Sequence, residues 1–140
     1  MKVLFVCRGN VGRSQIAEAL LKKQAGDRFE VSSAGTKISG PEQPIGELMP
    51  EIKEVLDVMT EVGVDVSQNI RRQVTEEMTN VADKVVLVVD ENDPIPDYLT
   101  DNPKIIRWDV LDPKGKDLEF TRKVRDQISG YIQKFVEENK

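Results

Sequence analysis

The residues best suited to chemistry stand together near the start of the chain, where the only cysteine precedes an arginine by six positions. Cys7 and Arg13 enclose five residues, among them Gly9 and Gly12, and Ser14 follows directly. Glycines permit a tight loop because they adopt backbone conformations that other residues avoid. A loop of this kind between a strand and a helix directs successive backbone N–H groups toward one point on the helix axis. The segment is therefore a candidate oxyanion-binding site.

A cysteine in this position is predicted to be a nucleophile. The positive end of the helix dipole and a neighbouring guanidinium both stabilise a thiolate, which is the reactive form of the side chain. Arg13 can bind two oxygens of a phosphoryl group with its planar guanidinium, which a lysine cannot do. Ser14 can donate its hydroxyl to the sulfur. A cysteine in an arbitrary strand is more often a small buried apolar residue, but the loop context favours a catalytic Cys7.

A nucleotide-binding loop of the Walker type is the competing phosphate site, and the spacing excludes it. That loop needs four residues between its glycines and a lysine before a serine or threonine. Here only Asn10 and Val11 separate Gly9 from Gly12, and Arg13 stands where the lysine is required.

The composition removes several other kinds of catalysis. The chain contains no histidine and one cysteine, so Ser-His-Asp and Cys-His arrangements, an intramolecular disulfide and the common zinc sites are all excluded. A carboxylate site for Mg²⁺ or Mn²⁺ stays open, although no cofactor is expected. Proton transfer near neutral pH must then involve a carboxylate, the thiol, a tyrosine or a lysine.

The charge balance and the apolar patterning limit the partners. Twenty Lys and Arg residues against 25 Asp and Glu residues give a net charge of −5, and without a long basic run we expect no nucleic-acid binding. The longest aliphatic run, residues 85–89, is far shorter than the roughly 20 residues of a membrane span. Residues 3–7 are too few for the apolar part of a signal peptide. We expect a cytoplasmic, monomeric protein with no membrane partner.

The elements that must position the loop follow from the spacing of apolar residues. Short apolar runs predict strands at residues 2–6, 28–32, 84–89 and 104–108. Three-and-four spacing predicts helices from Ser14, which can cap the first one, to Gly26, and at residues 50–62, 75–81 and 120–135. The alternation predicts an α/β protein with one open four-stranded parallel sheet flanked by helices. The length favours a single domain over residues 1–140.

Ligands of such sheets bind beyond the carboxyl ends of the strands. Four segments follow those ends, namely residues 7–14, 32–35, 90–93 and 109–112. We expect them to form one site. Asp90, Asp93, Asp109 and Asp112 are its candidate proton donors.

The segment from Val6 to Ala19, VCRGNVGRSQIAEA, resembles the phosphate-binding loop of the low-molecular-weight protein tyrosine phosphatase family. The superfamily also contains thioredoxin-coupled arsenate reductases. Further similarity at residues 33–36, 63–67 and 84–90, and at Asp112-Pro113 with the helix after it, extends the resemblance over nearly the whole chain.

The resemblance implies a role for individual residues. Cys7 would form a phosphocysteine, Arg13 would bind the oxyanion, and Ser14 would favour the thiolate. Asn10 would hold the loop through the turn at Ser32-Ser33. Asp112 would be the general acid, with Asp93, which also precedes a proline, as the competing candidate. The phosphate-binding loop would comprise Arg8, Gly9, Asn10, Val11, Gly12, Arg13 and Ser14.

The chain departs from the family pattern at three places. Many family phosphatases carry a second cysteine where this chain has Gly12, so their protective disulfide cannot form. The thioredoxin-coupled reductases use two further cysteines after the third strand, and this chain has none. No aromatic residue lies between Thr36 and Pro50 or directly after Pro113, where the tyrosine phosphatases wall their pocket. Tyr98 and Trp108 are expected to pack at the edge of a strand or helix.

Three functions are compatible with these residues. The first is a phosphomonoesterase that hydrolyses a phosphorylated protein or small molecule through a phosphocysteine, and phosphotyrosine is the substrate that the resemblance implies. The second is an arsenate reductase that uses an external thiol, since that reaction needs only Cys7 from the chain. The third is an oxyanion-binding module without catalysis.

Overall fold

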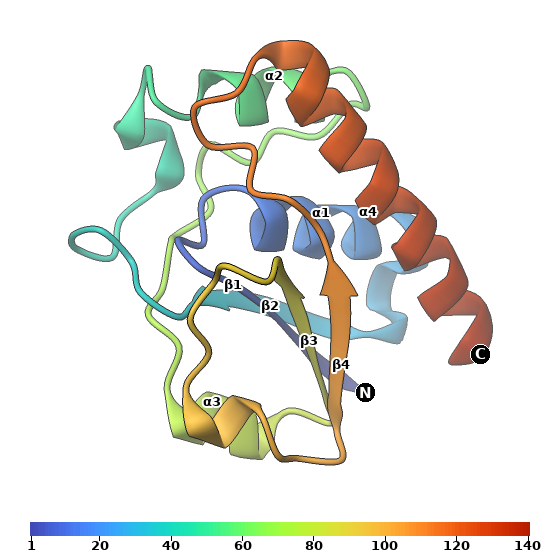
Figure 1. The fold of residues 1–140 in the computed structure, drawn as a ribbon. Coiled ribbons are helices and arrows are strands. Elements are labelled where there is room, and N and C mark those ends of the chain that lie inside the picture. Colours follow the sequence, from blue (N-terminus) through green and yellow to red (C-terminus); the bar gives the residue numbers. More distant parts are fainter.

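A four-stranded parallel sheet forms the centre of the structure. The computed structural model describes all 140 residues. Its strands are β1 (Lys2–Cys7), β2 (Glu30–Gly35), β3 (Lys84–Val89) and β4 (Ile105–Asp109). They lie in the order β2-β1-β3-β4, and every neighbouring pair is parallel (Figure 1). The predicted open parallel sheet is thus confirmed.

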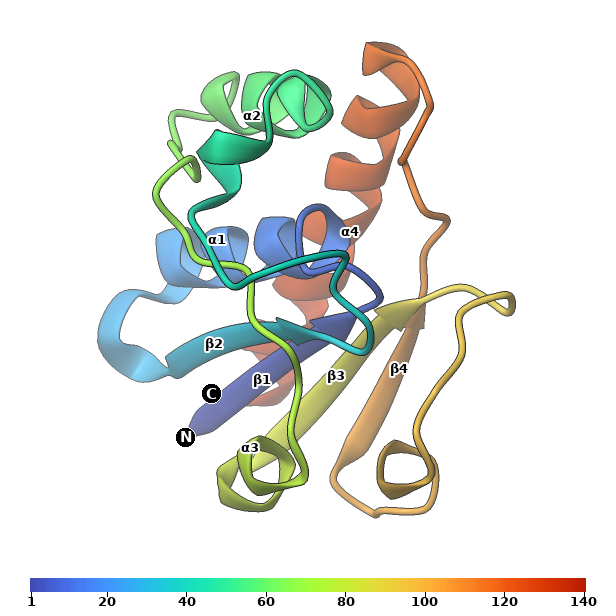
Figure 2. The same ribbon diagram turned by 90° about the vertical axis from the view of Figure 1, so that its left-hand side faces the viewer.

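The helices cover both faces of the sheet unequally. The long helices α1 (Arg13–Ala25) and α4 (Leu118–Glu138) lie on one face together with α2 (Lys53–Thr60), and the short α3 (Glu76–Val81) lies on the other (Figure 2). No helix is long and apolar enough to cross a membrane.

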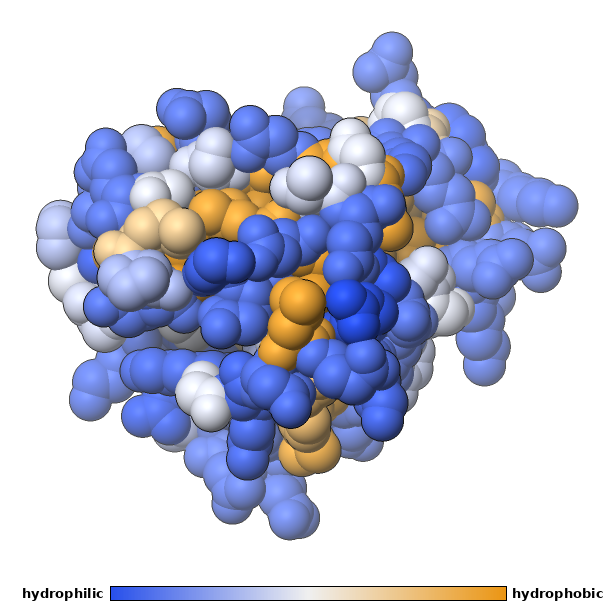
Figure 3. All heavy atoms as spheres, turned by 90° about the horizontal axis from the view of Figure 1, so that it is seen from above, coloured by the Kyte–Doolittle hydropathy of each residue, from blue (hydrophilic) through white to orange (hydrophobic).

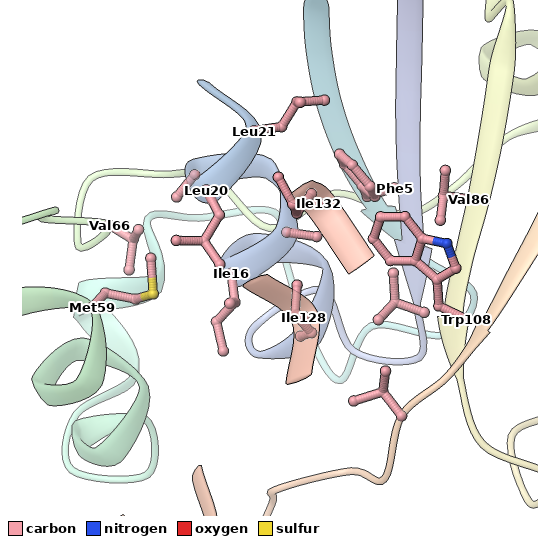
Figure 4. Close-up of a cluster of buried hydrophobic side chains, with 14 of the residues drawn as sticks. Phe5, Ile16, Leu20, Leu21, Met59, Val66, Val86, Trp108, Ile128 and Ile132 are labelled. Carbon is pink, nitrogen blue, oxygen red and sulfur yellow. The ribbon is translucent and has the colours of Figure 1, made fainter. Parts of the chain in front are cut away.

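Two apolar clusters match the alternation of side chains along the strands. Val3 and Phe5 of β1 belong to the larger cluster, beneath the long helices, whereas Leu4 and Val6 belong to the smaller one. Burial on both faces explains why β1 and β3 read as unbroken apolar runs. In the larger cluster Trp108 packs against Phe5, with 5.7 Å between the ring centroids (Figure 4). It also stacks on Tyr131, with 4.9 Å between the ring centroids. Trp108 is therefore a residue of the main core and not, as expected, an aromatic at the edge of an element.

The strand β2 differs from the prediction, which ended it at residue 32 and read residues 33–35 as a turn. The strand instead runs to Gly35, which is paired in register with Cys7. The small residues at this end are needed because the chain lies directly against the loop after β1. A Cβ atom added to Gly35 would come within 2.6 Å of the carbonyl oxygen of Arg8.

The helix α2 is shorter than the predicted span of residues 50–62. Lys53 N–H donates to the carbonyl of Pro50 and Val62 N–H to that of Met59, so tight turns replace regular helix at both ends. Gly63, with φ of 80°, follows the last of these turns. The apolar spacing therefore identified the helix but not its limits, because turns at helix ends keep the same periodicity.

The strand order places a crevice at the carboxyl end of β1. The chain passes from β1 to β2 on one side and returns to β3 on the other. Helices that follow neighbouring strands then diverge at that point, which is where parallel α/β sheets bind ligands. Cys7 is the last residue of β1 and lies at this switch point.

Candidate active site

The loop from Cys7 to Ser14 joins β1 to α1 at the switch point. Asn10 has a left-handed backbone conformation, with φ of 55°, which asparagine tolerates better than most residues. Beyond the sheet the loop stays paired with the chain after β2, because Thr36 N–H donates to the carbonyl of Cys7 and Lys37 N–H to that of Arg8. The loop is thus held by backbone on its β2 side.

A network of buried side chains supports the sulfur. Ser14 Oγ lies 2.9 Å from Cys7 Sγ and accepts a hydrogen bond of 2.7 Å from Asn10 Nδ2. Because that oxygen already accepts from Asn10, its own proton is available to the sulfur. Asn10 Nδ2 also donates to Ser33 Oγ, which in turn donates to Glu18 Oε1. The prediction that Ser14 caps α1 is therefore wrong. Gly12 is the N-cap residue and makes no side-chain hydrogen bond there.

Arg13 is buried, and hydrogen bonds to two acceptors fix its guanidinium. Its Nη1 donates to Asp93 Oδ2 at 2.8 Å and to the carbonyl of Val110 at 2.9 Å, and only 2% of the side chain is exposed. Burial alone would lower the pKa of Arg13, but attraction to Cys7, Asp93 and Asp112 outweighs it and raises the pKa. The guanidinium is consequently a permanent positive charge with a fixed orientation.

Asp93 is the partner of Arg13 that the sequence did not reveal. Its side chain is 5% exposed, and Oδ2 also accepts the backbone N–H of Asp90. Burial would raise the pKa of Asp93, yet the hydrogen bonds from Arg13 and Asp90 lower it, so the carboxylate stays charged. Sequence reasoning placed Asp93 at the correct edge of the sheet but considered it only as a proton donor.

Asp112 occupies a different position relative to Arg13. Its carboxylate is 40% exposed, lies 3.7 Å from Arg13 Nη2, and lines the same cavity as Cys7. Its Oδ1 accepts the backbone N–H of Lys114, which orients the side chain. Of the other two aspartates, Asp109 is largely exposed and paired with Arg107, while Asp90 accepts the backbone N–H of Asn92. Only Asp112 among the four lines this cavity.

The cavity above Cys7 measures about 760 Å³ and has no aromatic wall. The upper face of the molecule is largely hydrophilic, with apolar side chains exposed in its middle (Figure 3). Tyr98 packs with the smaller apolar cluster, away from this cavity.

No group of three or more Asp, Glu or Cys side chains could hold a metal ion. Besides the loop, the cavity is lined by Lys37, Ile38, Ser39, Leu48, Glu51, Ile52, Glu54, Val55, Arg71, Asp112, Pro113, Lys114, Gly115 and Thr121.

A parallel α/β sheet with a cysteine at the end of its first strand and an arginine at the start of its first helix defines an oxyanion-binding class of enzymes. The family model described as low molecular weight phosphotyrosine protein phosphatase matches residues 2–140, and the chain belongs to this family. The resemblance noted from the loop sequence is thereby confirmed.

Relatives of known name include both reductases and phosphatases. An arsenate reductase of Brevibacillus brevis is 31% identical over 96% of this chain and 93% of its own. The structure of a low molecular weight protein tyrosine phosphatase from T. tengcongensis has a TM-score of 0.77 at 30% identity and covers 99% of both chains. That of the YwlE arginine phosphatase from Geobacillus stearothermophilus has a TM-score of 0.78 at 25% identity, covering 98% of this chain and 91% of that one.

Proposed function

We propose that the protein is a cysteine-dependent phosphomonoesterase. The observation that carries the proposal is the convergence of Cys7, Arg13 and Asp112 on one cavity, with Ser14 hydrogen-bonded to the sulfur. A nucleophile, an oxyanion-binding guanidinium and a solvent-accessible carboxyl group are the three groups that phosphoryl transfer through a covalent intermediate requires.

In the first step Cys7 Sγ attacks phosphorus, and the bond between phosphorus and the ester oxygen breaks. Asp112 gives its proton to that oxygen, so the alcohol departs neutral and a phosphocysteine remains. Arg13 Nη1 is occupied by Asp93 and Val110, which leaves Nε and Nη2 for the phosphoryl oxygens. In the second step Asp112 takes a proton from water, the water oxygen attacks phosphorus, and the bond to sulfur breaks to release phosphate and the thiolate.

The supporting network has a consistent role in this mechanism. In the second step the Cys7 sulfur is the leaving group, and Ser14 donates a hydrogen bond to it. Asn10 and Ser33 keep Ser14 in place. The absence of an aromatic residue from the cavity wall bears on the substrate. A phosphotyrosine ring would contact aliphatic and charged side chains there, so the proposed substrate class is a phosphate monoester, on a protein or a small molecule.

Arsenate reduction is the second candidate, favoured by relatives named as arsenate reductases. Arsenate has the shape and charge of phosphate, so the same loop would bind it. Cys7 would attack arsenic with loss of water, and an external thiol would attack the Cys7 sulfur and release arsenite. A second external thiol would reduce the mixed disulfide, so that two thiols supply the two electrons. The chain offers no further cysteine for this relay.

One preparation should be assayed for phosphate release from phenyl phosphate and for arsenate-dependent oxidation of a low-molecular-weight thiol. We expect phosphate release to be faster in kcat/KM. Thiol oxidation with arsenate and no phosphate release would reject the phosphatase in favour of the reductase. Binding of phosphate with neither reaction would reject both in favour of a binding module.

A further inference from the structure

Arg71 is a buried cation that the proposed mechanism does not use. It lies in the segment between α2 and α3, is 4% exposed, and lines the cavity that contains Cys7. Its Nε donates to the carbonyl of Pro41 at 2.9 Å and Nη2 to Gln43 Oε1 at 3.1 Å. Two longer contacts, of 3.4 and 3.5 Å, reach Ser39. These four bonds leave one N–H group of Nη1 without an acceptor, since a guanidinium side chain has five.

None of these partners is a carboxylate, and Arg71 forms no ion pair. Burying a charge is costly unless a countercharge accompanies it. Neutral carbonyl and amide groups offset only part of that cost. By contrast Arg13, the other buried arginine, is paired with Asp93. The positive charge of Arg71 therefore remains uncompensated in the wall of the cavity.

The cavity lining contains further cations, Lys37 among them beside Arg8 and Lys114. Lys37 is exposed, lines the cavity, and is fixed against the loop by its backbone N–H bond to Arg8. The segment that follows it, with Ser39, Pro41 and Gln43, wraps around the Arg71 guanidinium. The glutamates of the cavity, Glu51 and Glu54, lie instead just before and within α2. Lys37 and the partners of Arg71 thus belong to one continuous segment, residues 37–43, and the two glutamates belong to another.

We propose that Arg71 and Lys37 form a second anion-binding subsite, which selects phosphate monoesters that carry a further negative group. The inference rests on the proposed function, because that function places the phosphoryl group over Cys7. The shared chemistry of the further group is an oxyanion, either a carboxylate or a second phosphate. A low-dielectric wall strengthens such an interaction compared with one in open water.

A purely structural role for Arg71 gives a different expectation. Gly40 lies so close that an added Cβ would approach Arg71 Nη2 to 2.6 Å, so the segment around residues 39–43 is closely packed on the guanidinium. If Arg71 only held this segment in place, its replacement would lower kcat/KM for every substrate by the same factor. Loss of a charged subsite would change the preference between an anionic substrate and a neutral one.

The test compares substrates of the same shape. The kcat/KM of phenyl phosphate with a para-carboxymethyl group is divided by that of its neutral carboxamide, and a benzene bisphosphate forms a second arm. We expect the wild type to prefer the carboxylate by about tenfold, the value of one charge-assisted hydrogen bond. Arg71→Gln should bring the ratio close to one, and Arg71→Lys should retain most of it. A larger preference in the bisphosphate arm would identify phosphate as the natural second group.

Exposed positions keep the test independent of folding. Lys37→Gln should lower the ratio, whereas Lys134→Gln, a matched change on an exposed lysine of α4 outside the cavity, should leave it unchanged. Unchanged ratios in both Lys37→Gln and Arg71→Gln, or a wild-type ratio of one, would overturn the subsite. Should no ester be hydrolysed, calorimetric binding of the corresponding phosphonates gives the same ratio, so failure of the phosphatase and failure of the subsite are separate results.

Discussion

Two carboxylates contact Arg13, and their surroundings give them different tasks. Asp93 is buried, keeps its charge, and holds the guanidinium from the side away from the cavity. Asp112 lies within the cavity, is partly exposed, and can reach a leaving oxygen and water. In the proposed mechanism Asp112 is therefore the general acid, and Asp93 is a positioning residue.

Leaving-group dependence separates these two tasks. Asp112→Asn should slow the hydrolysis of phenyl phosphate by roughly 10²-fold or more, which is the usual contribution of general acid catalysis. A nitrophenyl ester should suffer less, because its leaving oxygen departs without a proton. Asp93→Asn, measured on the same series, should lower kcat/KM by a similar factor for every ester. A steep leaving-group dependence in the Asp93 variant alone would mean that Asp93 carries the proton.

Gly12 determines what happens when the sulfur is oxidised. A sulfenic acid at Cys7 has no neighbouring thiol, so peroxide should drive the wild type to sulfinic and sulfonic acids, which thiols do not reverse. A Cβ atom on Gly12 would meet its nearest neighbour, Pro113, at 3.6 Å, which is an ordinary van der Waals contact, so this position has room for a Cβ. Gly12→Cys should regain activity with dithiothreitol after peroxide. Mass spectrometry decides the matter, and full thiol rescue of the wild type would refute the account.

At the scale of elements, the close approach of β2 to the loop shapes the site. Gly35 pairs with Cys7, and no side chain fits between Gly35 and the carbonyl of Arg8. Gly35→Ala should therefore displace the loop and destabilise the protein by about 1–3 kcal/mol, as overpacking does. Denaturant unfolding measures the stability, and kcat on phenyl phosphate should fall as well. Gly130→Ala is the control, because an added Cβ meets nothing within 4 Å there; equal behaviour of both variants would contradict the account.

The same contact explains which elements could be predicted from sequence. The predicted strand at residues 84–89 has the same bounds as β3, because buried parallel strands are continuous apolar segments. The end of β2 was not, because Ser33-Ala34-Gly35 is locally a turn sequence and becomes strand only through its pairing with β1. Likewise Ser14 is locally a good cap, but its bonds to Cys7 and Asn10 hold it inside the first turn of α1.

At the scale of the molecule, ion pairs join α2 to α4 above the sheet. Glu61, directly after α2, bonds Arg122 and Arg125 of α4, and the hydrogen bonds from these arginines lower the pKa of Glu61 to about 2. A lowered carboxyl pKa stabilises the fold above the ordinary value of 4.5, and this contribution is lost as the pH falls toward 2.

Glu61→Gln should consequently lower Tm by a few degrees at neutral pH, and the difference from the wild type should shrink as the pH falls from 4.5 toward 2. Circular dichroism melts across this range provide the measurement. Glu119→Gln removes a partner of Arg122 within α4 itself and should have a smaller effect. A Tm difference for Glu61→Gln that persists unchanged at acid pH would contradict the role of its charge.

The candidate site was predictable where its residues are consecutive and unpredictable where distant segments meet. Residue types and spacing predict an oxyanion-binding loop from Cys7 to Ser14. The parallel topology predicts that Asp93 and Asp112 lie at the same edge of the sheet, beyond the carboxyl ends of the strands. The partner of Arg13 and the enclosure of Arg71 depend on side-chain packing across 80 and about 30 positions of sequence. No local pattern encodes such contacts, because they form only after the sheet and its loops are assembled.

Replacement of the nucleophile tests the central claim most directly. Cys7→Ser keeps the shape of the loop, but its hydroxyl has no adjacent base to activate it. The steady-state release of phosphate from phenyl phosphate should fall by roughly 10⁴-fold or more, while calorimetry should show that inorganic phosphate still binds. Hydrolysis by the Cys7→Ser protein near the wild-type rate, above that of a mock-purified control, would contradict the account.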